Sequence, residues 1–339
     1  LPLDVLLMVA MALDMLSLLR LCAVSKPFHA FIHGHLAACR DALVAHYVPE
    51  PHLFLSCMRD FYVIIGGMAA LSFTVHDSSL RPPWLDVYVT TRHWDLFEAD
   101  LGKFLKLEQV YHNDRRAYGV NTPYYMYRTA LGRLLRVFVS DSLSPLHALI
   151  RSAPTTALFN YVGPDSFGVA YPWMTLRRRG LAPGWRRGRG YLDHWQRWHL
   201  TVLLSKGFVF RKHAASFDDV RLPIPFADVD RWPMDENTLA PICLRDQFLC
   251  TSQGRVMGDR GTIIVLFDTY PDAHKDLRRK HQLPYGFTTA WRFPGAVFDC
   301  GGDCLHEDDI LPLNVNLADA ILGTLPVLLA SRRSPVPGE

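Results

Sequence analysis

The sequence has little excess charge and few cysteines. Its 36 Lys and Arg residues face 33 Asp and Glu residues, which gives a net charge of +3 over 339 residues. Proteins that hold nucleic acid mainly by electrostatics are more basic than this, so nucleic-acid binding is not expected. Cysteine occurs seven times, an odd and sparse number. A dense disulfide framework is therefore excluded, and a reducing compartment, cytoplasm or nucleus, is favoured.

Long apolar runs without charge are also missing. The most apolar stretch, residues 1–23, contains Asp4, Asp14 and Arg20, and a charge at the centre of a membrane helix costs about 2.5–3.5 kcal/mol. No basic segment precedes the apolar run, as a secretory signal would need. We therefore expect no membrane association. The chain is nevertheless 49% hydrophobic, which is enough for folded cores and too much for a disordered protein.

The signatures of several enzyme classes are absent. There is no G-x-S-x-G elbow, no Walker loop and no H-E-x-x-H among the 15 histidines. Cys300, Cys304 and His306 offer three ligands close together, with Cys243 and Cys250 as spare candidates, whereas a structural zinc site needs four in a defined arrangement. A glycine-rich turn with ordinary thiols is the simpler reading. The sequence thus predicts no catalytic residue, no metal site and no cofactor.

The first forty residues predict three short helices. Apolar residues recur at helical spacing in 3–10, 16–21 and 28–32, and Asp14 and Ser25 stand where the second and third helices need N-caps. Three such helices cannot bury this much Leu, Met and Phe among themselves. The excess apolar surface should meet a partner or the rest of the chain.

This segment resembles an F-box. It reads LPLD at residues 1–4 and LSLLRLCAVSKPF at 16–28, against the family's usual Leu-Pro-x-Glu, Leu-x-Leu and Cys-x-Val-Ser-Lys; Asp4 replaces the more common Glu. The resemblance implies docking onto a Skp-family adaptor of an SCF-type ubiquitin ligase, with apolar helices in a hydrophobic groove. The adaptor-binding residues that it implies are Leu1, Pro2, Leu6, Leu7, Leu16, Leu19 and Val24.

Residues 61–105 have the order strand, double glycine, helix, strand, helix. Strands are predicted at 61–65 and 85–89, and helices at 68–73 and 91–105, with Gly66-Gly67 between the first strand and helix. This order resembles the nucleotidyltransferase fold. In active members the second strand presents two carboxylates at i and i+2, which point to one face and hold two metal ions.

The residues that would hold those metals are missing. Asp86 is flanked at i−2 and i+2 by Trp84 and Tyr88, and strand 134–139 carries Arg136 where a third carboxylate would be aligned. The resemblance therefore implies a degenerate, non-catalytic domain. The residues of its former nucleotide pocket would be Gly66, Gly67, Asp86 and Arg136.

The following segment extends the resemblance to fungal F-box proteins that carry a nucleotidyltransferase-like domain. The recurrent pieces are SPL at 144–146, TTALFN at 155–160, AYP at 170–172 and LRRRG at 176–180. Members of this kind are mostly uncharacterised, so the resemblance implies an architecture more than an activity.

A basic run follows, with aromatic residues between and after the arginines. Arginine interleaved with Trp or Tyr can form a platform for single-stranded nucleic acid. An exposed loop is the simpler reading, because glycines interrupt the run, and an acidic substrate or degron would use the same charges. The residues are Arg177, Arg178, Arg179, Trp185, Arg186, Arg187, Arg189, Tyr191, Trp195 and Trp198.

The predicted fold class is α+β. It comprises a three-helix F-box at 1–45, an inactive nucleotidyltransferase-like domain with a mixed sheet at 55–210, a β-rich region at 211–330 and a loose tail at 331–339. Within the β-rich region we expect strands at 262–267 and 288–293 and a final helix at 317–329.

The predicted function is that of a non-catalytic substrate receptor or adaptor, which brings an unknown protein substrate to the ligase. The alternative is a nucleotidyltransferase-fold enzyme or nucleotide-binding protein that uses Asp86 and Gly66-Gly67. A third reading is an interaction protein whose N-terminal helices pack inward and meet no adaptor.

Overall fold

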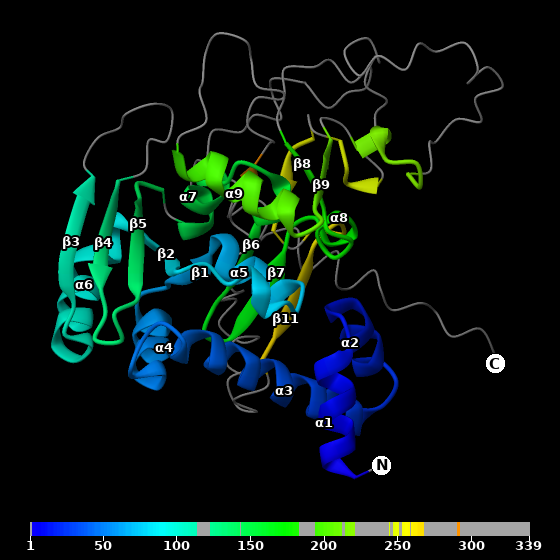
Figure 1. Ribbon diagram of the computed structural model, residues 1–339, viewed down its shortest axis with the longest axis horizontal. Helices are drawn as coiled ribbons and strands as arrows, with labels where there is room; N and C mark the ends of the chain where they lie inside the picture. The colour runs from blue at the N-terminus through cyan, green and yellow to red at the C-terminus, as the bar shows by residue number, and fades with distance from the viewer. Residues whose placement is uncertain are drawn as a thin grey trace, which may run out of the picture.

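The computed structural model of the chain shows an α+β fold, in which a helical N-terminal segment leads into a large mixed sheet (Figure 1). This confirms the predicted α+β class and the predicted mixed sheet. The structure describes residues 2–113, 123–142, 144–182, 194–211, 214–220, 244, 247–250, 253–257, 259–267 and 290–291. The expected helix at 317–329 and the tail at 331–339 lie outside the described residues.

Four helices precede the sheet: α1 (Leu3–Ala12), α2 (Met15–Cys22), α3 (Lys26–Ala45) and α4 (Pro51–Asp60). The two predicted N-caps are confirmed. The Asp14 carboxylate accepts a hydrogen bond from the Ser17 amide at 2.7 Å, and the Ser25 hydroxyl accepts one from the Phe28 amide at 3.4 Å. Helix α3 is not short as expected but has 20 residues. Its apolar stripe continues past residue 32, so the helix extends beneath the sheet.

The sheet formed by the described residues has eight strands in the order β11-β7-β6-β1-β2-β5-β4-β3. Strands β2 and β5 run parallel, and the other neighbouring pairs are antiparallel. The strands are β1 (Ile64–Gly66), β2 (Trp84–Thr90), β3 (Glu108–Asn113), β4 (Tyr124–Arg128), β5 (Leu134–Ser140), β6 (Asn160–Val162), β7 (Ser166–Val169) and β11 (Ile263–Leu266).

Two smaller strand pairs and further helices complete the described part of the chain. β8 (Arg179–Leu181) pairs with β9 (Val209–Arg211), and β10 (Arg255–Val256) with β12 (Ala290–Trp291). The helices are α5 (Gly67–Thr74), η1 (Ser78–Leu80), α6 (Thr91–Leu105), α7 (Pro145–Ser152), η2 (Thr156–Leu158), α8 (Pro172–Thr175), α9 (His194–Ser205) and η3 (Ala214–Ser216). No described helix has both the length and the apolar character needed to cross a lipid bilayer.

Helices cover both faces of the sheet, as Figure 1 shows for α3 and α4 on one side and α7 and α9 on the other. Every residue of β2 is buried. Successive side chains of a strand point to opposite faces. Leu85, Val87 and Val89 therefore join the core under α3, α4 and α6, while Tyr88 joins the core under α7. Asp86 shares the α7 face with Tyr88.

Strand β11 comes from the last third of the chain. It lies within the predicted strand 262–267 and pairs antiparallel with β7, from Ile263 opposite Val169 to Leu266 opposite Ser166. Residues from the predicted β-rich region 211–330 thus contribute a strand to the same sheet as residues 64–169. Strand β12 lies within the predicted strand 288–293.

Candidate functional site

Helix α1 carries an unusual amount of exposed apolar surface. Within α1, Ala10 is the buried residue, and the helix contacts α3. Apart from Asp4, the sequence LDVLLMVAMA is apolar, so packing one narrow face on α3 leaves apolar residues of the other faces in solvent. Leu3 is 70% exposed, Met8 70% and Met11 67%. Leu3, Leu7 and Met11 are spaced by four residues and form one stripe along the helix.

The predicted adaptor-binding residues divide into two groups. Pro2, Leu7 and Val24 are exposed, whereas Leu6, Leu16 and Leu19 are half-buried, and Leu19 packs against the main core. Leu1 lies outside the part of the chain that the structure describes. Sequence reasoning omitted Leu3, Met8 and Met11 from the anchors, although two spacings were the available signal: Leu3, Leu7 and Met11 recur every four residues, and Met8 is three residues before Met11.

The second predicted site, Gly66, Gly67, Asp86 and Arg136, is brought together by the sheet. Gly66 on β1 is opposite Asp86 on β2, and Asp86 is opposite Arg136 on β5. Arg136 Nε donates to Asp86 Oδ1 at 2.7 Å and Arg136 Nη2 to Asp86 Oδ2 at 3.0 Å. The side chains are 3% and 1% exposed, so this is a buried, bidentate ion pair.

The guanidinium lies among aromatic rings. Its carbon is 5.0 Å from the ring centroid of Phe138, 5.2 Å from that of Trp84 and 5.9 Å from that of Tyr124. Cation–π attraction at such distances adds to the ion pair, most strongly where water is excluded. Positions 84 and 88 thus carry aromatic rings instead of carboxylates, and these rings pack around or beside Arg136.

The double glycine is enclosed by side chains. A Cβ at Gly66 would lie 2.4 Å from a Leu149 methyl and 2.6 Å from the Tyr88 ring. A Cβ at Gly67, whose φ is 61°, would lie 2.4 Å from Asp86 Oδ2. Backbone amides bind phosphate when a glycine-rich loop leaves space at a helix N-terminus. Here Leu149, Tyr88 and Asp86 lie against the two glycines, so neither position has room for a side chain.

The chemistry available to this cluster is therefore limited. Both oxygens of Asp86 accept hydrogen bonds from Arg136, whereas a two-metal site needs carboxylate oxygens free to ligate and more than one carboxylate. The geometry favours a structural role for the cluster in joining β2 to β5.

His199 on α9 is buried beside this ion pair. Burial, and secondly the positive charge of Arg136, lower its pKa from 6.5 to about 3. Neither ring nitrogen has a hydrogen-bond partner within the described residues. The unfolded chain binds a proton at this residue below about pH 6.5, whereas the folded chain keeps the imidazole neutral.

We therefore expect His199 to make stability fall as pH falls. Its contribution is complete above about pH 6.5, and acidification from pH 7 to pH 5 should remove about 2 kcal/mol. The measurement is urea unfolding at both pH values for the wild type and for His199→Leu, which does not titrate. If the wild type and His199→Leu lose the same free energy of unfolding between pH 7 and pH 5, this assignment is contradicted.

The described part of the basic run is paired with acids. Arg177 donates to Asp219 at 3.0 Å, Arg179 pairs with the same carboxylate, and Arg178 donates to Asp77 at 2.7 Å. These arginines are already neutralised, which counts against a nucleic-acid platform. The structure does not describe the rest of the basic run, which comprises Trp185, Arg186, Arg187, Arg189, Tyr191 and the side chain of Trp195. Trp198 packs against a buried cluster.

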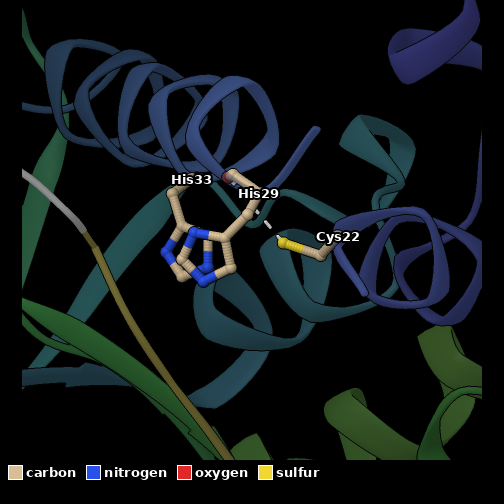
Figure 2. A group of neighbouring side chains, drawn as sticks. All are labelled: Cys22, His29 and His33. Atoms are coloured by element: carbon tan, nitrogen blue, oxygen red, sulfur yellow. Dashed lines mark hydrogen bonds between the residues drawn. The ribbon is translucent and has the colours of Figure 1, made fainter. Parts of the chain in front are cut away.

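The structure also brings together two Cys/His groups that sequence reasoning did not identify. Figure 2 shows Cys22 at the end of α2 beside His29 and His33 on α3. The second group consists of His35 and Cys39 on α3 and His76 after α5. The available signal was the four-residue spacing within α3. Of the cysteines and the histidine considered from the sequence, Cys250 is buried, and Cys243, Cys300, Cys304 and His306 fall in ranges that the structure does not describe.

Comparison of the chain with protein families, with curated proteins and with solved structures finds no match.

Proposed function

We propose that this chain is a non-catalytic substrate receptor or adaptor, and that α1 and α2 dock onto a Skp-family adaptor of an SCF-type ubiquitin ligase. The exposed apolar stripe Leu3, Leu7 and Met11 on α1 carries the proposal. Fully burying a side chain of this size contributes about 1.5–3 kcal/mol. A soluble protein rarely leaves such surface clustered unless another molecule covers it.

The resemblance of residues 1–28 to an F-box supplies the identity of that molecule. A hydrophobic groove that accepts an amphipathic or apolar helix matches a helix whose exposed anchors recur every four residues. The position of α1 at the edge of the molecule, away from the sheet (Figure 1), leaves the stripe accessible to a partner. Val24, which follows α2, is a further exposed apolar residue of this segment, at 68%.

The proposed function is non-catalytic because of the Asp86–Arg136 pair. Both oxygens of Asp86 accept hydrogen bonds from Arg136, and Leu149 and Tyr88 lie directly against Gly66. This geometry does not favour the alternative of a nucleotidyltransferase or nucleotide-binding protein. Binding would act by holding a protein substrate near the ligase and so raising its effective concentration.

The test is binding of the purified chain to purified Skp-family adaptor, measured by titration calorimetry. The wild type should bind, and Leu3→Asp combined with Leu7→Asp should weaken binding at least tenfold, because the groove would have to bury two carboxylates. Asp at position 3, the first residue of α1, is favourable for the helix, and circular dichroism checks that α1 persists in the double variant.

The matched control is Leu96→Asp, which places a charge at another exposed leucine, 62% exposed on α6. It should bind the adaptor as the wild type does. Failure of the folded wild type to bind at micromolar concentrations would overturn the proposal, as would equal binding by the α1 variant.

A further inference from the structure

We propose that His35, Cys39 and His76 form a binding site for a divalent transition-metal ion of the zinc class. The three donor atoms lie within 4.8 Å of one another. None of the three donors belongs to the proposed adaptor-binding stripe or to the Asp86–Arg136 pair, although Met11 of that stripe lines the cavity beside them.

The donors come from two elements that the fold packs together. His35 and Cys39 are four residues apart on α3 and so share one face of the helix. His76 lies two residues beyond the end of α5. Cys39 Sγ is 3.6 Å from His35 Nε2 and 3.9 Å from His76 Nε2. The two rings are nearly perpendicular, at 87°, with centroids 5.7 Å apart.

These separations fit one shared ion. Zinc binds sulfur at about 2.3 Å and imidazole nitrogen at about 2.0–2.1 Å in tetrahedral geometry, which places sulfur and nitrogen about 3.6 Å apart. The measured distances, 3.6 and 3.9 Å, agree with that value to within a few tenths of an ångström. Cysteine with two histidines is also a donor set that suits zinc and its neighbours rather than Mg²⁺ or Ca²⁺.

His76 is held in an orientation suited to a ligand. Its backbone has a φ of 56°, and its amide bonds to Phe73 O while the Asp77 amide bonds to Ser72 O. This is a Schellman ending, in which glycine usually takes the left-handed position. The His76 Nδ1 lies 2.8 Å from the Leu13 carbonyl oxygen. Since a carbonyl can only accept, Nδ1 carries the proton and Nε2, the atom near Cys39, has the free lone pair.

The same three residues line a cavity of about 390 Å³ between α1, α3 and the end of α5. Asp77 also lines it, but its carboxylate accepts hydrogen bonds from Arg178 at 2.7 Å and from the Ser79 amide at 2.9 Å. Three protein donors beside a cavity match sites in which the fourth ligand is water or a small solute. Burial raises the pKa of the Cys39 thiol, so coordination would displace one proton from sulfur to solvent.

The donor atoms of the other Cys/His group also lie within 4.8 Å of one another, but their directions differ. His29 and His33 stack with centroids 4.0 Å apart and 23° between their planes, so their nitrogen lone pairs run side by side instead of meeting. In Figure 2 the Cys22 sulfur points to the backbone of His29, whose carbonyl oxygen it contacts at 3.8 Å. Cys22 is therefore a matched control rather than a second proposal.

The test is titration of the full-length chain with Co²⁺ under a non-thiol reductant. One equivalent should produce a sulfur-to-cobalt charge-transfer band and the visible bands of a tetrahedral ion. Cys39→Ser should lose the charge-transfer band, His76→Gln should weaken binding at least tenfold, and Cys22→Ser should leave both unchanged. Zn²⁺ should displace the cobalt and raise the melting temperature of the wild type but not of Cys39→Ser.

Near-ultraviolet circular dichroism confirms that each variant is folded. If Cys39→Ser does not fold, the Co²⁺ affinity of His76→Gln tests the proposal instead. This variant should fold, because His76 is partly exposed and follows a helix end. The proposal is overturned by a wild type without a thiolate band at one equivalent, or by retention of full affinity in the folded variants. Loss of the band in Cys22→Ser would assign the sulfur donor to the other group instead.

Discussion

Replacing Arg136 by methionine is expected to lower the free energy of unfolding by about 3–5 kcal/mol, because it leaves the Asp86 carboxylate buried without its counter-charge. The Asp86 side chain is 1% exposed, so solvent cannot replace the guanidinium. Methionine is similar in length and fits among the aromatic rings that surround Arg136. The measurement is urea unfolding at pH 7.

The double variant Asp86→Leu with Arg136→Met separates charge from packing. Since it removes both charges, it should recover most of the loss; exchanging a buried ion pair for apolar residues is often near neutral. The control is Arg59→Met, whose partner Asp165 forms a pair with side chains 39% and 36% exposed. That substitution should cost about 0–1 kcal/mol. A cost for Arg136→Met no larger than that for Arg59→Met would refute the buried-pair argument.

Replacing Gly67 by alanine should lower the free energy of unfolding by about 2–4 kcal/mol, since two unfavourable terms add. The first is backbone conformation, because φ is 61° and an L-residue disfavours that region. The second is a clash, because the new Cβ would lie 2.4 Å from Asp86 Oδ2. The carboxylate cannot move aside without breaking its two hydrogen bonds to Arg136.

Gly132→Ala isolates the backbone term. Gly132 also has a positive φ, 71°, but a Cβ there would meet nothing within 4 Å. Its substitution should cost about 1 kcal/mol, the conformational penalty alone. Both variants are compared by urea and thermal unfolding. If Gly67→Ala and Gly132→Ala lower the free energy of unfolding equally, the clash with Asp86 adds nothing to the cost at Gly67.

Local signals in the sequence were sufficient for several elements. The predicted helix 91–105 is α6 with the same bounds, and the predicted strand 85–89 is the centre of β2. Asp14 and Ser25 cap their helices as expected. Each of these features depends on neighbours within a few residues, so composition and spacing carry the information. Helix α3 exceeded its predicted length because its apolar stripe continues past residue 32 and is buried in the main core.

The candidate sites required more than spacing. The sequence placed Asp86 and Arg136 on two strands, but only the parallel register of β2 and β5 puts them opposite each other in an ion pair. It placed Leu7 on an apolar helix, yet which apolar residues stay in solvent depends on how α1 packs on α3. For Cys39 and His76, 37 residues apart, no local pattern connects the two donors.

The sequence by itself therefore determined the helical, apolar character of the N-terminal segment, the strand and helix order around the double glycine, and the lack of a second carboxylate beside Asp86. These follow from residue type and short-range periodicity. Tertiary structure alone decided that strand β11 joins the sheet, that Arg136 neutralises Asp86, and that His35, Cys39 and His76 converge. Such pairings depend on strand register and helix packing, which are set by burial across the whole core rather than by any one segment.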